Sequence, residues 1–211
     1  MTDHLVIAID GPAGSGKSTL GRALAGRLGL RTLDTGASYR AVAALAIRRG
    51  VALDDLAAVA SLASSARLEI SDRVMIDDID VTEEIRSEEV NAAVSVVAAN
   101  PEVRSALVAW QRRWADEHAG GIVEGRDIGS VVFPDAPVKL FLTANVEERA
   151  RRRSEEGQAS VERRDRMDST RAVSPLTTAP GATVVDTTEM PVDEVVDLVL
   201  TMVDAATGGK R

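Results

Sequence analysis

A glycine-rich loop near the N-terminus constrains this chain more than any other sequence feature. The loop follows the apolar stretch 5–10 and fills every fixed position of the pattern G-x-x-x-x-G-K-[ST] with Gly11-Pro12-Ala13-Gly14-Ser15-Gly16-Lys17-Ser18. Its glycines let backbone N–H groups close around a phosphate, and the helix expected to begin near Gly16 directs its positive dipole end at the same anion. The pattern therefore predicts a nucleoside triphosphate site, in preference to a turn that only joins a strand to a helix.

Two side chains of the loop have distinct expected tasks. Lys17 supplies a positive charge to the phosphates, and Ser18 supplies a hydroxyl ligand to Mg²⁺. Only three of the 25 basic residues are lysines, so the lysine of the loop is not a product of lysine abundance. The residues of this segment that we expect to bind ATP are Gly11, Pro12, Ala13, Gly14, Ser15, Gly16, Lys17, Ser18 and Thr19.

The composition limits the kinds of protein that this chain can be. A chain of 211 residues with 45% hydrophobic content can bury one substantial core and a small satellite subdomain. Cysteine is absent, which excludes disulfides, thiolate metal sites and a cysteine nucleophile. The net charge of −8 disfavours a long polyanionic partner, and no stretch approaches the roughly 18 apolar residues of a membrane span. We expect a cytoplasmic monomer that has neither nucleic acid nor a membrane as a partner.

Short apolar runs alternate with amphipathic helical stretches along most of the chain. This order predicts a three-layer P-loop α/β fold, in which a parallel five-stranded sheet is flanked by helices. The strands are expected at 5–10, 31–33, 121–124, 138–142 and 182–186. The helices are expected at 18–28, 37–49, 55–66, 84–99, 102–117, 145–153 and 191–205. Three brief alternating runs near 63–83 interrupt this order and predict a small antiparallel insertion.

Two acids mark the end of the strand expected at 121–124. Asp127, in the run Gly-Arg-Asp-Ile-Gly, lies where open α/β folds place their ligands, although glycine and aspartate also form ordinary turns. Glu124 is a candidate to hold a water bound to Mg²⁺, and a solvated acid is the alternative. Both acids are therefore candidate site residues.

Two arginine-rich segments follow. The segment 145–153 starts with an N-cap asparagine and ends in arginines, a distribution that compensates a helix dipole without any ligand. Further on, Arg164, Asp168 and Arg171 share one helical face, which by itself is typical of a solvated ion-pair ladder. The two clusters together favour a mobile cationic cover over bound phosphates, because phosphoryl transfer needs water to be excluded.

Assembled, these motifs resemble the bacterial cytidylate kinase family of P-loop nucleoside monophosphate kinases over essentially the whole chain. The resemblance rests on residues 9–17, 33–40, 84–86, 125–139 and 171–176. The second and fourth of these segments are the most specific, whereas many P-loop proteins share the first. The stretch between Arg153 and Arg164 is shorter than is usual in the family.

The resemblance implies an organisation and roles for single residues. One kinase domain would span 1–211, with a monophosphate-binding region at 36–118 that includes the insertion, and a lid at 145–172. The residues implied for the phosphate of CMP are Thr35, Arg40, Arg126 and Arg171. Those implied for the cytosine edge are Ser95, Arg104 and Asp127, and those for the sugar are Arg164 and Asp168. Arg152 and Arg153 would bind ATP from the lid, and the implied catalytic residues are Lys17, Arg126 and Arg171.

The implied reaction is transfer of the γ-phosphoryl group of ATP, with Mg²⁺, to CMP or dCMP. Such transfer needs positioning and charge neutralisation more than covalent catalysis. The alternatives are a P-loop kinase for another small acceptor, a GTPase-type switch, and an ATPase that binds nucleic acid. The chain contains no Asn-Lys pair and so lacks the guanine-reading motif N-K-x-D of a switch, while the net charge disfavours the last alternative.

Overall fold

The computed structural model describes residues 4–153, 166 and 176–209, and the chain separates into two units. Unit 1 comprises residues 1–32 and 114–211, and unit 2 comprises residues 33–113. Each unit has a hydrophobic core of its own.

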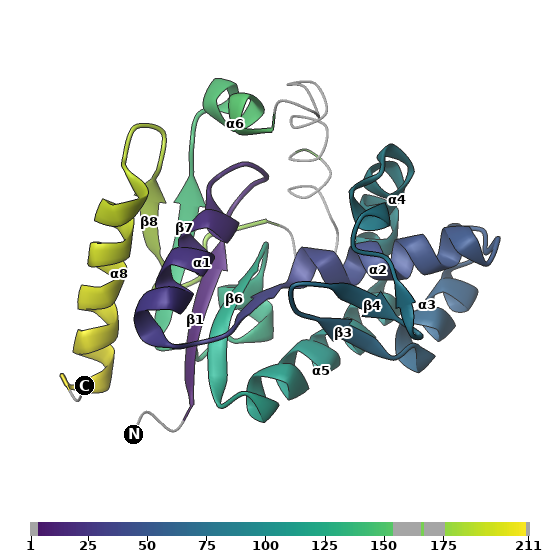
Figure 1. The fold of residues 1–211 in the computed structure, drawn as a ribbon, viewed down its shortest axis with the longest axis horizontal. Helices are drawn as coiled ribbons and strands as arrows, with labels where there is room; N and C mark the ends of the chain where they lie inside the picture. The colour runs from purple at the N-terminus through teal and green to yellow at the C-terminus, as the bar shows by residue number, and fades with distance from the viewer. Residues whose placement is uncertain (1–3, 154–165, 167–175, 210–211) are drawn as a thin grey trace. The chain divides into compact units, whose positions relative to one another are not determined.

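Unit 1 is built on a sheet with the strand order β2-β6-β1-β7-β8. The strands are β1 (Leu5–Asp10), β2 (Thr32–Asp34), β6 (Gly120–Gly125), β7 (Val138–Thr143) and β8 (Thr183–Asp186). β1 pairs in parallel with β6 and β7, and β7 pairs in parallel with β8, so their carboxyl ends meet at one edge (Figure 1). The predicted parallel sheet of five strands is confirmed, with each strand at its expected place.

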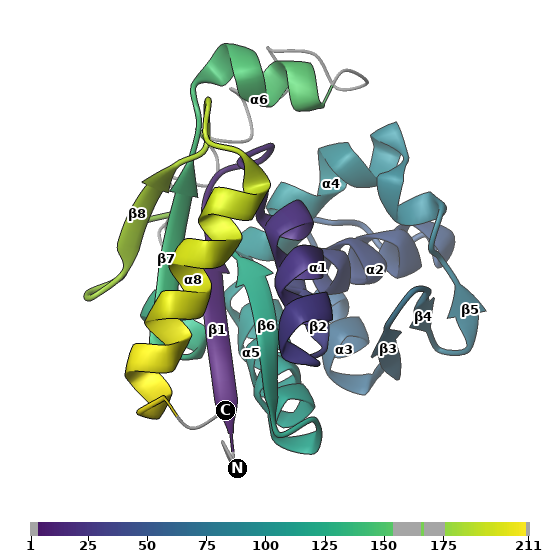
Figure 2. The ribbon, with the colours of Figure 1, turned by 60° about the vertical axis from the view of Figure 1, so that its left-hand side comes forward.

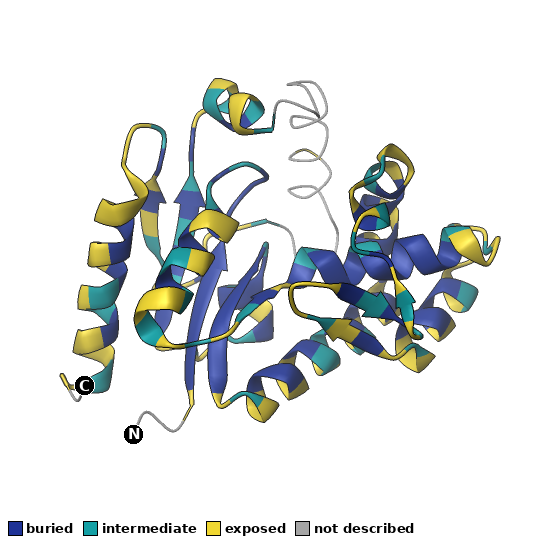
Figure 3. Cartoon of the chain, viewed as in Figure 1, coloured by how far each residue is buried: buried dark blue, intermediate teal, exposed yellow. Residues whose placement is uncertain are grey.

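Two helices of unit 1, α1 (Lys17–Leu28) and α8 (Val192–Thr207), lie side by side against this sheet (Figure 2). Leu20 and Leu24 of α1 and Val195 and Val199 of α8 are buried with the apolar residues of the strands. The outward faces of both helices are largely exposed, whereas β1 and β6 are buried along their whole length (Figure 3). Continuous burial is typical of central strands in a parallel sheet, because helices leave neither face open to water.

Unit 2 consists of helices and a separate small sheet. Its helices are α2 (Thr35–Arg48), α3 (Leu56–Ser65), the 3₁₀ turn η1 (Glu84–Arg86), α4 (Glu88–Ala99) and most of α5 (Pro101–Glu117). The small sheet has the order β3 (Leu68–Ile70), β4 (Val74–Ile76) and β5 (Ile79–Asp80), with antiparallel neighbours. This sheet confirms the insertion that was predicted near 63–83.

Some helix boundaries differ from the prediction, and two of these differences have a clear cause. The helix expected at 84–99 is divided, because Ser87 leaves the helical conformation and its hydroxyl accepts the N–H of Val90 at 3.2 Å, so that α4 begins anew at Glu88. α2 begins at Thr35 and not at 37, since Asp34 occupies the N-cap position.

The segment after β6 holds an element that was not expected, a π-helical turn η2 (Ile128–Val132). By contrast, α6 (Val146–Arg152) begins as predicted, with Asn145 accepting the N–H of Glu148 at 2.8 Å. None of the helices that the structure describes has the length and apolar character of a membrane span.

Candidate active site

The glycine-rich loop is shaped by close approaches that only glycine permits. Gly11 has a φ of 146°, and a Cβ at this position would lie 2.1 Å from the carbonyl oxygen of Leu142 in β7. Gly14 has a φ of 78°, and its Cβ would lie 2.7 Å from the carbonyl oxygen of Arg149 in α6. A larger residue at either position would force the loop away from the sheet edge or from α6.

Polar groups of the loop turn toward its interior. The Nζ atom of Lys17 donates to the carbonyl oxygens of Gly11 at 2.9 Å and Pro12 at 2.8 Å. Ser15 is fully buried, and within the described part of the chain its hydroxyl has no hydrogen-bond partner. A buried polar group without a partner costs about 1–3 kcal/mol, so this hydroxyl fits a site that a ligand oxygen completes.

Ser18 and Glu124 form a pair of oxygen groups beside the loop. Ser18 Oγ donates to Glu124 Oε2 at 2.7 Å, and Glu124 is buried near the end of β6, opposite Ile9 of β1. Hydroxyl and carboxylate oxygens are hard ligands of the kind that Mg²⁺ prefers. The residues present therefore fit the metal that the sequence predicts at Ser18.

Arg126 approaches the loop from the segment after β6. Its Nη1 atom donates to the carbonyl oxygen of Gly11 at 2.8 Å, so Arg126 and Lys17 share one acceptor. Asp127 is buried and occupies the N-cap position of η2. Two cations on one carbonyl concentrate positive charge where the predicted phosphates would lie.

Asp10, the last residue of β1, belongs to the same group of side chains. Its carboxylate accepts the backbone N–H groups of Ile128 and Gly129, each at 2.8 Å. Burial raises the pKa of Asp10 to about 6, and the negative charge of Asp127 adds to the rise, while the two N–H groups and Lys17 oppose it. The sequence analysis did not single out Asp10, although an acid that ends a buried strand directly before such a loop was a signal that could have found it.

Two arginines of α6 bind the backbone on the outer side of the loop. Arg149 is buried, and it donates from Nε to the carbonyl oxygen of Ala144 at 3.0 Å and from Nη1 to that of Ala13 at 3.2 Å. Arg152 donates from Nη1 to the carbonyl oxygen of Gly14 at 3.4 Å and from Nε to Glu148 at 2.8 Å. In this structure the arginines of α6 therefore hold the loop in place.

Thr187 connects α6, the loop and the sheet. Its hydroxyl lies 3.0 Å from the carbonyl oxygen of Ser15 and 3.1 Å from that of Thr143, and it accepts a hydrogen bond from Arg152 Nη1 at 3.0 Å. Arg152 Nη2 also donates to the carbonyl oxygen of Thr187 at 2.6 Å. No sequence pattern marks this threonine, because only the tertiary structure brings it to the loop.

Arg40, expected to bind the phosphate of CMP, lies on α2 of unit 2. Its Nη1 atom donates to the carbonyl oxygen of Ile85 at 3.0 Å and to Oδ1 of Asn91. These two acceptors come from η1 and α4, so the direction of the guanidinium depends on packing within unit 2. Asn91 was not recognised from the sequence, since a single polar residue on an alanine-rich helix has no distinctive pattern.

Arg104, expected to read the base, lies on α5 and is buried. Its guanidinium lies 5.6 Å from the centre of the Tyr39 ring, a cation–π arrangement, and Nη1 lies 3.5 Å from the carbonyl oxygen of Ala98. Thr35 and Ser95 are also buried in unit 2. Burial of polar side chains that the resemblance assigns to the acceptor is compatible with a recognition site.

The structure thus divides the expected residues between the two units. Unit 1 brings the loop together with Glu124, Arg126, Asp127 and Arg152, whereas Thr35, Arg40, Ser95 and Arg104 belong to unit 2. Thr19 is exposed on α1, and Arg153 follows the end of α6. The expected residues Arg164, Asp168 and Arg171 lie outside the described residues.

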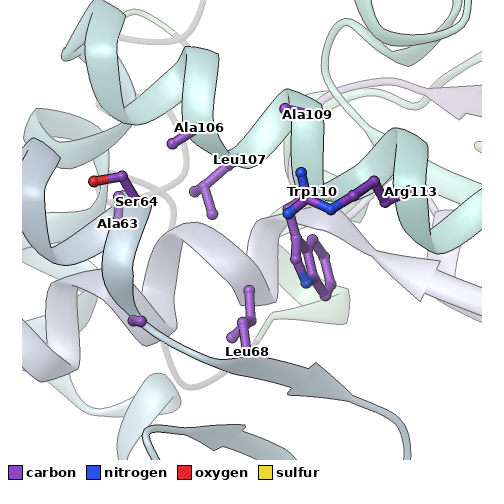
Figure 4. A pocket seen from close by; sticks show the side chains of 9 residues that line it. Ala63, Ser64, Leu68, Ala106, Leu107, Ala109, Trp110 and Arg113 are labelled. Carbon is purple, nitrogen blue, oxygen red and sulfur yellow. The ribbon is translucent and has the colours of Figure 1, made fainter.

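A cavity of about 170 Å³ lies in unit 2, between the end of α3, the start of β3 and α5 (Figure 4). Four alanines and Ser64 line it, together with Leu68, Leu107, Trp110 and Arg113. None of the expected site residues lines this cavity. A nucleotide site needs several converging polar groups, so we place the site at the loop and not here.

Comparisons with known proteins agree with this geometry. The family model for cytidylate kinase matches residues 7–205. A cytidylate kinase from Pelotomaculum thermopropionicum is 51% identical over 218 residues, which cover 94% of this chain and 96% of the relative. Another from Rhodococcus jostii is 48% identical over 224 residues, with 98% of each chain covered. The crystal structure of TT1252 from Thermus thermophilus covers 95% of this chain and 97% of its own, with 23% identity and a TM-score of 0.50, which shows a likeness of fold.

Proposed function

The chain belongs to the cytidylate kinase family, and we propose that it transfers the γ-phosphoryl group of ATP to CMP or dCMP, giving CDP or dCDP and ADP. The observation that carries this proposal is the family match over residues 7–205, which includes a loop with every fixed position intact. The chemistry is that of an ATP-dependent phosphotransferase, in which positioning and charge neutralisation supply most of the rate enhancement.

The glycine-rich loop holds the phosphates of ATP. Lys17 turns from the carbonyl oxygen of Gly11 to phosphate oxygens of ATP, and Arg126, which shares that carbonyl oxygen in this structure, turns to the phosphate of CMP. The buried hydroxyl of Ser15 gains an acceptor at the same time. These cations offset the charge that develops on the transferred group, which is where a preorganised site lowers the barrier most.

Ser18 would hold Mg²⁺ directly, and Glu124 would hold it through a water. The donor set supports this assignment, since the hydroxyl and the carboxylate lie 2.7 Å apart. When bound, Mg²⁺ would neutralise part of the negative charge of the phosphates. Glu124 orients the Ser18 hydroxyl and would accept hydrogen bonds from a water bound to the metal.

Recognition of the acceptor separates this activity from that of other small-acceptor kinases. Cytosine presents an exocyclic amino donor where uracil presents a carbonyl, so the carboxylate of Asp127 accepts from the first and is repelled by the second. Ser95 and Arg104 complete the reading of the base. The assigned phosphate ligands of CMP are Thr35, Arg40, Arg126 and Arg171, and those of the sugar are Arg164 and Asp168.

We also infer the organisation in which these residues act. A single kinase domain spans 1–211, with the monophosphate-binding region at 36–118 and a lid at 145–172 from which Arg152 and Arg153 bind ATP. The contacts of Arg152 with the loop and with Thr187 support a place for this arginine beside the triphosphate. The partners are small nucleotides alone, and the protein acts as a cytoplasmic monomer.

The test is a coupled assay of ADP release with ATP, Mg²⁺ and each nucleoside monophosphate in turn. We expect the highest kcat/KM for CMP and dCMP. A higher kcat/KM for another acceptor would indicate that the chain is a P-loop kinase for that acceptor. A response to GTP alone would indicate a nucleotide switch, and ATP hydrolysis that polynucleotide stimulates would indicate a nucleic-acid-dependent ATPase.

A further inference from the structure

The carboxylate of Asp10 makes two hydrogen bonds to consecutive peptide groups of another element. Oδ1 accepts the N–H of Ile128 and Oδ2 accepts the N–H of Gly129, both at 2.8 Å. Asp10 is only 2% exposed, so water does not compete for either oxygen. One side chain of β1 therefore fixes the start of η2.

The two N–H groups lie at the start of η2, directly after Asp127. The first N–H groups of a helical turn have no partner within the turn and need an acceptor from elsewhere. Asp127 occupies the N-cap position directly before them, with φ −145° and ψ 26°, and provides no side-chain cap. Asp10 supplies the acceptors for both N–H groups instead.

The arrangement also joins Asp127 to the phosphate-binding loop. Asp10 precedes Gly11 in the chain, so the residue that holds η2 is also the one from which the loop begins. A displacement of the Asp127 backbone would lengthen at least one of the two 2.8 Å hydrogen bonds. Asp10 therefore fixes the position of the Asp127 backbone relative to the phosphate-binding loop.

Holding an ionised Asp10 carboxylate at this buried position costs free energy. Burial and the nearby charge of Asp127 both disfavour the ionised form of Asp10, and the pKa of its carboxyl is accordingly raised to about 6. A cap of neutral side chains would avoid two acids close together in a buried place. Costly acids of this kind gather at functional sites more often than at purely structural ones.

We propose that Asp10 is a positioning residue for specificity: it aligns Asp127, through the N–H groups of Ile128 and Gly129, so that Asp127 distinguishes cytosine from uracil. The inference deepens the proposed function and depends on it, since Asp127 must read the base for its alignment to matter. Asp10 itself touches neither the base nor the phosphates in this account.

The test compares Asp10→Asn with the wild type in kcat/KM for CMP and for UMP. Asparagine retains one acceptor but turns an N–H group toward the second N–H, so the start of η2 loses part of its anchor. We expect the ratio of CMP to UMP to fall at least about threefold, with a smaller change in the KM for ATP. Asp55→Asn is the matched control, because Asp55 caps α3 by accepting the N–H of Ala58 at 3.0 Å and no expected site residue lies on α3. The control should leave the ratio unchanged.

A double-mutant cycle shows whether Asp10 acts through Asp127. In an Asp127→Ala background, Asp10→Asn should change the CMP to UMP ratio by less than about twofold, because the residue that it aligns is gone. Hydrogen exchange of the peptide that holds residues 126–132 should be faster in Asp10→Asn than in the wild type. Asp10→Ala, which removes both acceptors, is a second variant and should lower the ratio at least as far.

Two results would overturn the inference. One is an equal loss of kcat/KM for CMP and UMP in Asp10→Asn, and the other is a full effect of Asp10→Asn in the Asp127→Ala background. A wild type without preference for CMP would instead contradict the proposed function, before any variant of Asp10 is compared. The two failures are therefore distinguishable.

Discussion

Ser18 Oγ donates a 2.7 Å hydrogen bond to Glu124 Oε2, which joins the first turn of α1 to the end of β6. Glu124 is buried whereas Ser18 is exposed, so a buried carboxylate orients a hydroxyl that the solvent can reach. A ligand that approaches the loop from solvent meets this hydroxyl in a fixed orientation.

Glu124→Gln should weaken Mg²⁺ use. An amide accepts less strongly than a carboxylate and removes one negative charge, so the Mg²⁺ concentration for half-maximal rate should rise about 10-fold. The measurement is a Mg²⁺ titration of ADP release at saturating nucleotides. An unchanged half-saturation, with the fold intact by thermal melting, would mean that Glu124 only anchors Ser18.

Lys17→Met should lower kcat at least about 100-fold, a loss of roughly 2.7 kcal/mol of transition-state stabilisation, because the charge that follows the transferred phosphoryl group is lost. Thermal stability should change little, since the glycines set the loop backbone. Lys139→Met is a matched control, because Lys139 also donates to two backbone carbonyls, those of Pro134 and Pro180, outside the site. A kcat within about threefold of wild type for Lys17→Met would refute the assigned role.

Asp127→Ala should remove most of the preference for CMP. A buried acceptor that is left facing a carbonyl costs about 1–3 kcal/mol, so the wild type should favour CMP over UMP at least about tenfold in kcat/KM. The variant should harm CMP far more than UMP. Asp135→Ala, an exposed acid in the same loop region, is the control. An equal reduction for both acceptors would show that Asp127 acts on phosphate or Mg²⁺ instead.

Asp10 should make the free energy of unfolding depend on pH. Its folded pKa of about 6 lies above the ordinary 3.8, so the ionised carboxyl destabilises the folded state. This cost is fully present above pH 6 and is relieved as the pH falls toward 3.8, because the folded protein then binds the proton first. The free energy of unfolding of Asp10→Asn minus that of the wild type should therefore be higher at pH 8 than at pH 5, by on the order of 1 kcal/mol in urea unfolding, because only the wild type loses stability as the pH rises. The same difference at both pH values would contradict the raised pKa.

The two arginines of α6 should have separable effects. Arg149→Ala should lower the free energy of unfolding by about 2 kcal/mol, because the carbonyl oxygens of Ala13 and Ala144 lose a buried donor. Arg152→Ala should mainly raise the KM for ATP, since Arg152 lies less buried at the loop and at Thr187. Urea unfolding and ATP titrations of the two variants check this division, and a similar loss of stability in both would contradict it.

Much of the fold was predictable because local patterns and tertiary packing agree. Leu20 and Leu24 of α1 recur at helical spacing and are both buried against the sheet, and the apolar run before Gly11 is the central strand β1. Prediction failed where a single side chain changes the course of the backbone. Ser87 divides one apolar helical pattern into η1 and α4, and hydrophobic periodicity does not register a hydroxyl that captures an N–H.

The sequence by itself determined the phosphate-binding loop, the alternation of strands and helices and the residue types of the candidate site, because each depends on neighbours within one turn or one strand. Only the tertiary structure decided that Asp10 anchors the segment after Asp127, that Thr187 reaches Ser15 and that Arg149 supports Ala13. These contacts join residues more than 100 positions apart in the chain. They follow from parallel strands that bring their carboxyl ends to one edge, and the register of such a sheet is set by burial of whole faces, which no local pattern contains.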